Sequence, residues 1–281
     1  VTPLLARVYP NGMADVNAFH AAGGMPFIIG HLLEAGLLQS QVKTVIGSGL
    51  QAYTQNAALG DNQTLTWTPA KTETSDPAVL RPLSEPFQNS GGLKNLEGNL
   101  GRAIIKISSL SPDQLVIEAP ARVFTSQQAL KQAFDADELN QDMVCVVRNQ
   151  GPAANGMPEL HGLTPVLGVL QQRGYRIGLV TDGRMSGASG KIPAAIHLTP
   201  EALSGGPVAC IQDGDMIRID AVAGTLQVLA SDFDQRQAVA VDDQEQQSGL
   251  GRELFDHFRR NVGTSDCGAS VFFYNHVGRD K

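Results

Sequence analysis

The feature that most restricts the fold of this chain is a series of short apolar runs after Gly98, separated by turn residues. The runs are "AIIKI", "LVIEA", "ARVF", "MVCVV", "RIGLV", "AAIHL", "PVACI", "MIRID" and "TLQVLA". Short β-rich runs bounded by turn residues predict strands, and "DAVAGT" predicts a hairpin between the last two. Many short strands with few helices favour a barrel or another closed β-structure.

Helical patterns are few in this sequence. In the first 46 residues, "MPFIIGHLLEAGLL" places apolar residues at helical spacing, and Gly36 is a stop signal. Within the β-rich part, "SQQALKQAF" with Ser126 as N-cap and "LTPVLGVLQQRG" closed by Gly174 predict two helices. A last helix is predicted in "GRELFDHFRRNV". The expected class is α+β, with a mainly β carboxy-terminal domain.

The segment from about residue 47 to 97 shows no periodicity and contains "TLTWTPAKTETSDPAVLRPLSEPFQNSGG", with four prolines. A long structureless run is uncommon inside one compact unit. We therefore expect three parts: residues 1–46, a linker over residues 47–97, and a barrel domain over residues 98–281.

Charge and composition exclude several classes of function. The formal net charge of the 281 residues is −7, which disfavours a nucleic-acid partner, so an anionic ligand would need a local positive cluster. No apolar run approaches the roughly 20 residues that span a bilayer, so no membrane partner is expected. The chain lacks an initial Met and a secretory signal, and we expect it to be the carboxy-terminal piece of a longer protein.

The three cysteines are widely separated and form no CxxC, zinc or ferredoxin spacing. Cys145 and Cys210 lie in apolar runs and are expected to be small buried hydrophobic residues, whereas Cys267 is expected to be an exposed thiol. Scattered thiols in odd number favour a cytoplasmic location.

The loop "TDGRMSGASGK", from Thr181 to Lys191, follows an apolar strand and combines three glycines with hydroxyls and positive charge. Glycines allow close backbone approach, and successive N–H groups in such a turn bind anions. Arg184 and Lys191 would add charge-assisted hydrogen bonds. The spacing GxxxGxxG differs from the dinucleotide and P-loop motifs. A tight surface turn with solvated charges is the alternative.

A second polar loop, "RNQGPAANGMPELHGLTP", also follows a strand and contains Glu159 two residues before His161. Glu159 is either a first-turn helix cap or a ligand for a hard divalent cation, since such ions prefer carboxylate oxygens. A third loop, "GGLKNLEGNLGRAIIK", holds Asn99 and Arg102, which either face a site or shape the turn.

Several long motifs, in order, resemble the family of dihydroxy-acid and sugar-acid dehydratases. They are "ARVYPNGMADVNAFHAAGGMPF", "GGLKNLEGNLGRAIIK", "IEAPARVF", "QGPAANGMPELHGLTP", "LVTDGRMSGASGKIPAAIHLTPEA" and "GGPVACIQDGDMIRID". Within the family, "GRMSGASGK" and "ANGMPELH" are similar to the phosphogluconate dehydratase branch. The resemblance covers nearly the whole chain.

The resemblance implies a hydro-lyase that converts a 2,3-dihydroxy acid to a 2-keto-3-deoxy acid, for this branch 6-phosphogluconate in the Entner–Doudoroff pathway. It implies an amino-terminal α/β domain with an iron–sulfur cluster, expected to be 4Fe–4S, whose helical tail would be residues 1–46. It also implies a carboxy-terminal barrel like the mobile domain of aconitase. The partners expected are a phosphorylated sugar acid, the amino-terminal half and a second copy in a homodimer.

The resemblance also assigns residues. It makes Ser186 the base for the C2 proton and Glu159 a magnesium ligand. Arg184, two residues before Ser186, is expected from its charge to stabilise the serine alkoxide or to bind the substrate carboxylate. Thr181, Asp182, Ser189 and Lys191 are expected to bind substrate, the last two at its phosphorylated end.

The sequence departs from the family pattern in lacking the amino-terminal half with its cluster cysteines, so this chain alone is expected to be inactive and to bind no cluster. Two alternatives stay open: dehydration of a non-phosphorylated sugar acid or a branched-chain dihydroxy acid, or a non-catalytic sugar-phosphate binding module.

Overall fold

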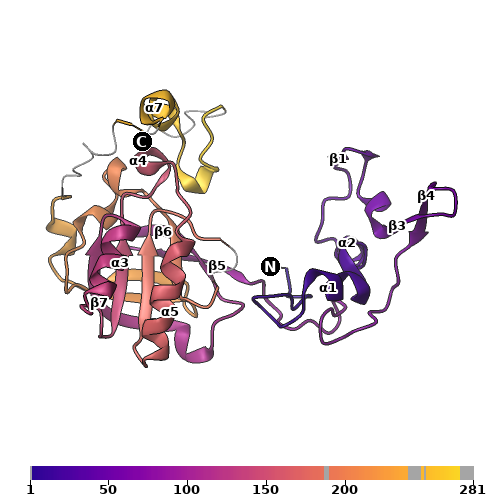
Figure 1. Cartoon of the computed structure of the whole chain (residues 1–281), viewed down its shortest axis with the longest axis horizontal. Coiled ribbons are helices and arrows are strands. Elements are labelled where there is room, and N and C mark those ends of the chain that lie inside the picture. The colour runs from indigo at the N-terminus through magenta and orange to yellow at the C-terminus, as the bar shows by residue number, and fades with distance from the viewer. Residues whose placement is uncertain (1, 187–189, 240–247, 250, 273–281) are drawn as a thin grey trace. The chain divides into compact units, whose positions relative to one another are not determined.

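The structure is a computed structural model that describes residues 2–186, 190–239, 248–249 and 251–272. The chain divides into two compact units, residues 1–92 and residues 93–281, drawn in Figure 1. The β-rich unit begins with strand β5 at Leu93, a few residues before the start expected from the sequence.

The first unit contains two consecutive helices and four short strands. Asp15 caps the first helix by accepting a hydrogen bond from the N–H of Ala18 (2.8 Å). The second helix matches the predicted one and ends at Glu34, two residues before Gly36 at φ +67°. The elements are α1 (Val16–Ala22), α2 (Gly24–Glu34), β1 (Lys43–Thr44), β2 (Gly47–Ser48), the 3₁₀ helix η1 (Gln51–Thr54), β3 (Gln55–Leu59) and β4 (Leu65–Pro69).

The segment expected as a linker contains a hairpin that the sequence does not predict. Strands β3 and β4 pair antiparallel, with Ala57 opposite Trp67. Nearly all their residues are exposed on both faces, so no buried face imposes an alternating apolar pattern.

Eight strands of the described residues close into a barrel in the order β10-β6-β5-β12-β11-β7-β8-β9. Strands β7, β8, β9 and β10 run parallel to one another, and β5 is parallel to β12, while the other pairs are antiparallel. The closed β-structure predicted from the sequence is therefore present as a mixed barrel. The strands are β5 (Leu93–Gly98), β6 (Gly101–Lys106), β7 (Val116–Phe124), β8 (Met143–Val147), β9 (Ile177–Thr181), β10 (Ala194–Thr199), β11 (Met216–Asp220) and β12 (Thr225–Val228).

Helices cover part of the outer surface of the barrel. Helix α3 begins after Ser126, whose side chain accepts a hydrogen bond from the N–H of Ala129 as the sequence predicts, and Gly174 follows α5 at φ +96°. The helices are α3 (Gln127–Asp135), α4 (Pro152–Asn155), α5 (Thr164–Gln172) and α7 (Arg252–Asn261), and the 3₁₀ helices are η2 (Pro112–Gln114), η3 (His161–Leu163), η5 (Ala202–Ser204), η6 (Pro207–Cys210), η7 (Phe233–Gln235) and η8 (Ser265–Cys267). Within the described residues, no helix is long and apolar enough to cross a membrane.

Successive residues of the buried strands serve two different cores. In β8, Val144 and Val146 belong to the core inside the barrel, here called the inner core. Met143, Cys145 and Val147 belong to a second core that includes buried residues of α3 and α5, here called the outer core. Side chains alternate between the two faces of a strand, so a strand that is covered on both faces reads as a continuous apolar run.

Two predicted strands, "LVIEA" and "ARVF", are one strand, β7, that continues through Pro120. The missing N–H of proline is tolerated because the pairing with β8 starts only at the next residue, Ala121. On the other side of β7, the N–H of Ala121 donates to Asp215 O (2.7 Å).

The predicted strand "PVACI" is wrong. It forms η6, because Gly206 and Pro207 start a 3₁₀ turn whose Val208 and Ala209 are buried in the inner core.

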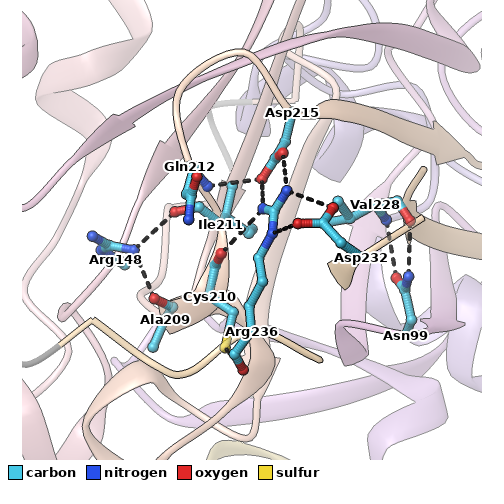
Figure 2. Close-up of polar contacts among 10 residues, drawn as sticks. All are labelled: Asn99, Arg148, Ala209, Cys210, Ile211, Gln212, Asp215, Val228, Asp232 and Arg236. Atoms are coloured by element: carbon cyan, nitrogen blue, oxygen red, sulfur yellow. Dashed lines mark hydrogen bonds and ion pairs between the residues drawn. The ribbon is translucent and has the colours of Figure 1, made fainter. Parts of the chain in front are cut away.

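A polar cluster around Arg236 lies beside η6 (Figure 2). Arg236 makes two bonds to Asp215 (2.6 and 3.0 Å) and two to Asp232 (2.9 and 3.0 Å). Asn99 exchanges two hydrogen bonds with the backbone of Val228 (2.8 and 2.9 Å), which shows that it shapes the β5–β6 turn.

Candidate active site

The candidate site lies where two neighbouring parallel strands end. Strands β8 and β9 pair with Val147 opposite Thr181, so the loops that follow them leave the barrel at the same edge. These are the two polar loops that the sequence marks separately. An isolated parallel bridge joins Glu159 to Arg184, and Leu160 N–H donates to Arg184 O (3.1 Å).

Asp182 and Thr181, expected to bind substrate, form the buried base of these loops. The Asp182 carboxylate accepts hydrogen bonds from the backbone N–H groups of Asn149 (3.1 Å), Gln150 (2.8 Å) and Ala202 (3.0 Å). Burial raises the pKa of Asp182, although these N–H groups act in the opposite direction. Thr181 Oγ1 accepts from Gly183 N–H (2.9 Å). In the structure both side chains hold backbone.

A glycine is required at position 183 because the two loops are in close contact. A Cβ atom there would lie 2.7 Å from the Cβ of Gln150 and 2.9 Å from a methyl group of Leu160. Leu160 and Met185 are both buried in the outer core, so each loop has an apolar anchor just before the residue that it presents.

Glu159 binds both loops with one carboxylate. Its Oε1 accepts the N–H of Ser186 (2.8 Å) and the N–H of His161 (2.9 Å), and its Oε2 pairs with Arg184 Nη1 (3.1 Å). The bond to His161 reaches the first residue of η3, but Glu159 is not the cap that one interpretation of the sequence predicts, because Leu160 holds the N-cap position and no side chain caps this helix. The bond to Ser186 fixes the loop that begins at Thr181 and ends at Lys191, here called the glycine loop. This bond could not be predicted from either loop alone.

Arg184 points at Glu159. Its Nε donates to Met157 O (2.9 Å), and its Nη1 makes the ion pair already described. Both side chains of the pair are partly exposed, so the pair itself adds little stability.

Ser186 is half-buried and lies beside the exposed His161, with Oγ 3.4 Å from the ring Nδ1. From the sequence, His161 stands out merely as a neighbour of Glu159. Its position opposite Ser186 depends on the contact between the loops, which no pattern within one loop encodes.

His197 of β10 is a second histidine that the sequence does not single out. It has φ +56°, its N–H donates to Gly183 O (2.8 Å), and burial followed by the charge of Arg184 lowers its pKa. Lys191 is exposed at the end of the glycine loop, and Gln114 Nε2 reaches its carbonyl (3.4 Å). Ser189 lies outside the described residues.

The residues described do not form a metal or cluster site by themselves. Among them no group of three or more histidine, cysteine or acidic side chains is arranged to hold a metal ion. Burial raises the pKa of Cys145 to about 12, Cys210 Sγ contacts Arg236 O, and Cys267 is exposed as expected. Glu159 is a single carboxylate with three protein contacts, so further magnesium ligands would have to come from elsewhere.

Comparison with protein-family models gives two matches. The model described as dihydroxy-acid/6-phosphogluconate dehydratase C-terminal covers residues 78–269, and the corresponding N-terminal model covers residues 1–53. The first match includes every site residue named above.

Three similar proteins illustrate the match. The chain is 55% identical to phosphogluconate dehydratase of Rhizobium meliloti (strain 1021) over 98% of its length and 46% of the relative. It is 48% identical to phosphogluconate dehydratase of Escherichia coli (strain K12), again over 98% and 46%. It is 38% identical to dihydroxy-acid dehydratase of Dinoroseobacter shibae over 82% of the chain and 38% of the relative. The chain thus spans less than half the length of these relatives.

Proposed function

Since this chain belongs to the dihydroxy-acid/6-phosphogluconate dehydratase family, we propose that it supplies the carboxy-terminal part of a phosphogluconate dehydratase. The enzyme would eliminate water from 6-phospho-D-gluconate to give 2-dehydro-3-deoxy-6-phosphogluconate, a step of the Entner–Doudoroff pathway. Relatives at 48 and 55% identity with that name support this substrate over a branched-chain dihydroxy acid.

The observation that carries the proposal is that Ser186, Arg184 and Glu159 meet at the barrel edge where the loops after β8 and β9 are in contact. We call this edge the rim. A serine hydroxyl becomes a useful base when nearby groups stabilise its alkoxide. Ser186 sits on a backbone fixed by Glu159, and Arg184 brings positive charge to the same rim. In the proposed mechanism Ser186 Oγ takes the C2 proton of the substrate. Arg184 orients Glu159, and Glu159 in turn holds the backbone at Ser186, in the part of the glycine loop that we also call the serine loop.

The proposal includes two groups for which ligands outside the described residues would be needed. The iron–sulfur cluster, expected as 4Fe–4S, would serve as a Lewis acid for the C3 hydroxyl. Magnesium would be held by Glu159 through its remaining oxygen lone pairs together with ligands from outside the described residues. The barrel would correspond to the mobile domain of aconitase. The closed mixed barrel of this unit supports that correspondence.

The distal phosphate is assigned to the end of the glycine loop. A phosphate dianion needs a cation and several N–H or O–H donors. Lys191 offers the cation and Ser189 a hydroxyl. A homodimer, a cytoplasmic location and the inactivity of residues 1–281 alone stay predictions.

The test uses a full-length dehydratase that carries this sequence, purified without oxygen, with formation of the 2-keto-3-deoxy product as the assay. Wild type should act on 6-phosphogluconate, and Ser186→Ala should lower kcat by about 10²–10⁴-fold with the cluster spectrum intact. Ser231→Ala, an exposed serine elsewhere in the barrel unit, is the control and should keep full activity. A wild-type enzyme without activity on this substrate would reject the proposal.

A further inference from the structure

We propose that His161 is the proton acceptor that activates Ser186, an inference that rests on the proposed function. The two side chains come from different loops and meet with Oγ 3.4 Å from Nδ1. That separation is long for a hydrogen bond, but such contacts tighten when substrate binds.

The backbone on both sides of the pair is fixed, so the approach is built into the loops. Glu159 Oε1 accepts both the Ser186 N–H and the His161 N–H, and this one atom sets the spacing of the two residues. Leu160 and Met185, the residues just before them, are buried in the outer core. Both loops are therefore anchored where they present the pair.

The proposed step uses Nδ1 of His161 as the acceptor, so the ring proton must lie on Nε2. Nearest to the pair, Glu159 and Arg184 bind each other, while the carboxylates of Asp182 and Glu201 accept backbone N–H groups of the same loop. Gln127 of α3 donates to Glu159 O (3.1 Å) and holds the same loop from the helix side. The exposed ring can exchange protons with solvent.

The proposed step balances as follows. His161 Nδ1 takes the hydroxyl proton of Ser186, and Oγ takes the C2 proton of the substrate. The electron pair of the C2–H bond forms the C2=C3 bond, and the C3–O bond breaks. The leaving hydroxide takes the proton of the imidazolium, directly or through solvent, and departs as water. The enol then becomes the 2-keto acid, and Ser186 ends with its hydroxyl restored.

The test compares His161→Gln and His161→Ala with Ser186→Ala and with the double variant His161→Gln/Ser186→Ala, all in the full-length enzyme. Each histidine variant should lower kcat by about 10²–10⁴-fold with little change in KM, and the kinetic isotope effect with C2-deuterated substrate should rise. The double variant should be no slower than Ser186→Ala, because His161 acts through Ser186. Added imidazole should partly restore His161→Ala, since the site is exposed.

The control is His257→Gln on α7, which should keep wild-type kcat and isotope effect. Normal kcat in both His161 variants would overturn the inference, as would a loss without a larger isotope effect and without rescue by imidazole. A double variant much slower than Ser186→Ala would also overturn it. Failure of the proposed function is distinct, because wild type would then form no product at all.

Discussion

Asp182 allows a quantitative test of how the two site loops are held, because its buried carboxylate joins three segments of backbone. We consider two substitutions, Asp182→Ala and Asp182→Asn. The alanine removes both oxygen atoms and leaves the N–H groups of Asn149, Gln150 and Ala202 without their acceptor. The asparagine keeps one oxygen, and its amide NH₂ group faces an N–H donor.

The magnitude follows from these contacts. Each buried N–H left without a partner costs about 1–3 kcal/mol, so three would cost roughly 3–9 kcal/mol. Burial of the carboxylate is itself unfavourable, as the raised pKa of Asp182 indicates. Removing this buried charge therefore offsets part of the loss. We therefore expect Asp182→Ala to lower the free energy of unfolding by about 3–5 kcal/mol, the lower half of that range. For Asp182→Asn, where two of the three N–H groups keep an acceptor, the loss should be about 1–3 kcal/mol.

The assay is urea unfolding followed by far-ultraviolet circular dichroism, since Trp67, the one tryptophan, lies in the first unit and would not report on the barrel. Asp135→Ala, on the exposed side of α3, is the matched control and should change stability by less than about 0.5 kcal/mol. A loss below about 1 kcal/mol for Asp182→Ala, or a larger loss for the asparagine than for the alanine, would refute the reasoning.

The raised pKa of Asp182 also predicts the direction in which stability changes with pH. Because the folded pKa of Asp182 is raised, its contribution to stability is fully present below the unfolded pKa and is lost as pH rises through the folded value. The deficit of Asp182→Asn relative to wild type should therefore be larger at about pH 4 than at about pH 7.

Three further predictions concern the site and the barrel. Lys191→Ala in the full enzyme should lower kcat/KM on 6-phosphogluconate by roughly ten- to a hundredfold, because one charge-assisted bond to phosphate is lost, and should leave activity on gluconate unchanged. Equal losses on both substrates would show that Lys191 does not bind the phosphate. Glu159→Gln should raise the magnesium concentration needed for half-maximal activity and spare the cluster spectrum; an unchanged requirement would limit Glu159 to its backbone contacts. Arg236→Lys should lower the unfolding midpoint, because lysine cannot make paired bonds to both Asp215 and Asp232, whereas Arg260→Lys on exposed α7 should not; equal midpoints for the two variants would contradict the assignment.

The sequence predicts well those parts of the fold whose residues are buried on a regular face. Strand β8 has the predicted bounds because all five of its residues are buried between the inner and outer cores. Helix α3 begins where Ser126 predicts, because capping is a local interaction. The hairpin β3–β4 is missed because its strands face solvent, and η6 is mistaken for a strand because a buried 3₁₀ turn is as apolar as a strand.

The site is predicted only in part, for a different reason. Each loop shows from its own residues that it is polar and follows a strand, and the β8–β9 pairing then places both at one edge. The sequence does not show which side chains reach across. The contact of Glu159 with Ser186, and of His161 with Ser186, spans more than twenty residues of chain and depends on the register of two strands.

The double role of Glu159 Oε1 has a dynamic consequence. Because one atom accepts the N–H groups of both Ser186 and His161, neither loop can move away from it without changing the hydrogen bonding of the other. The two loops should then open as one cooperative unit, and the two amide hydrogens should exchange with solvent at a common rate. Any cation that draws this oxygen toward itself would loosen both amides together, so the order of the serine loop and the ionic surroundings of Glu159 would be thermodynamically linked.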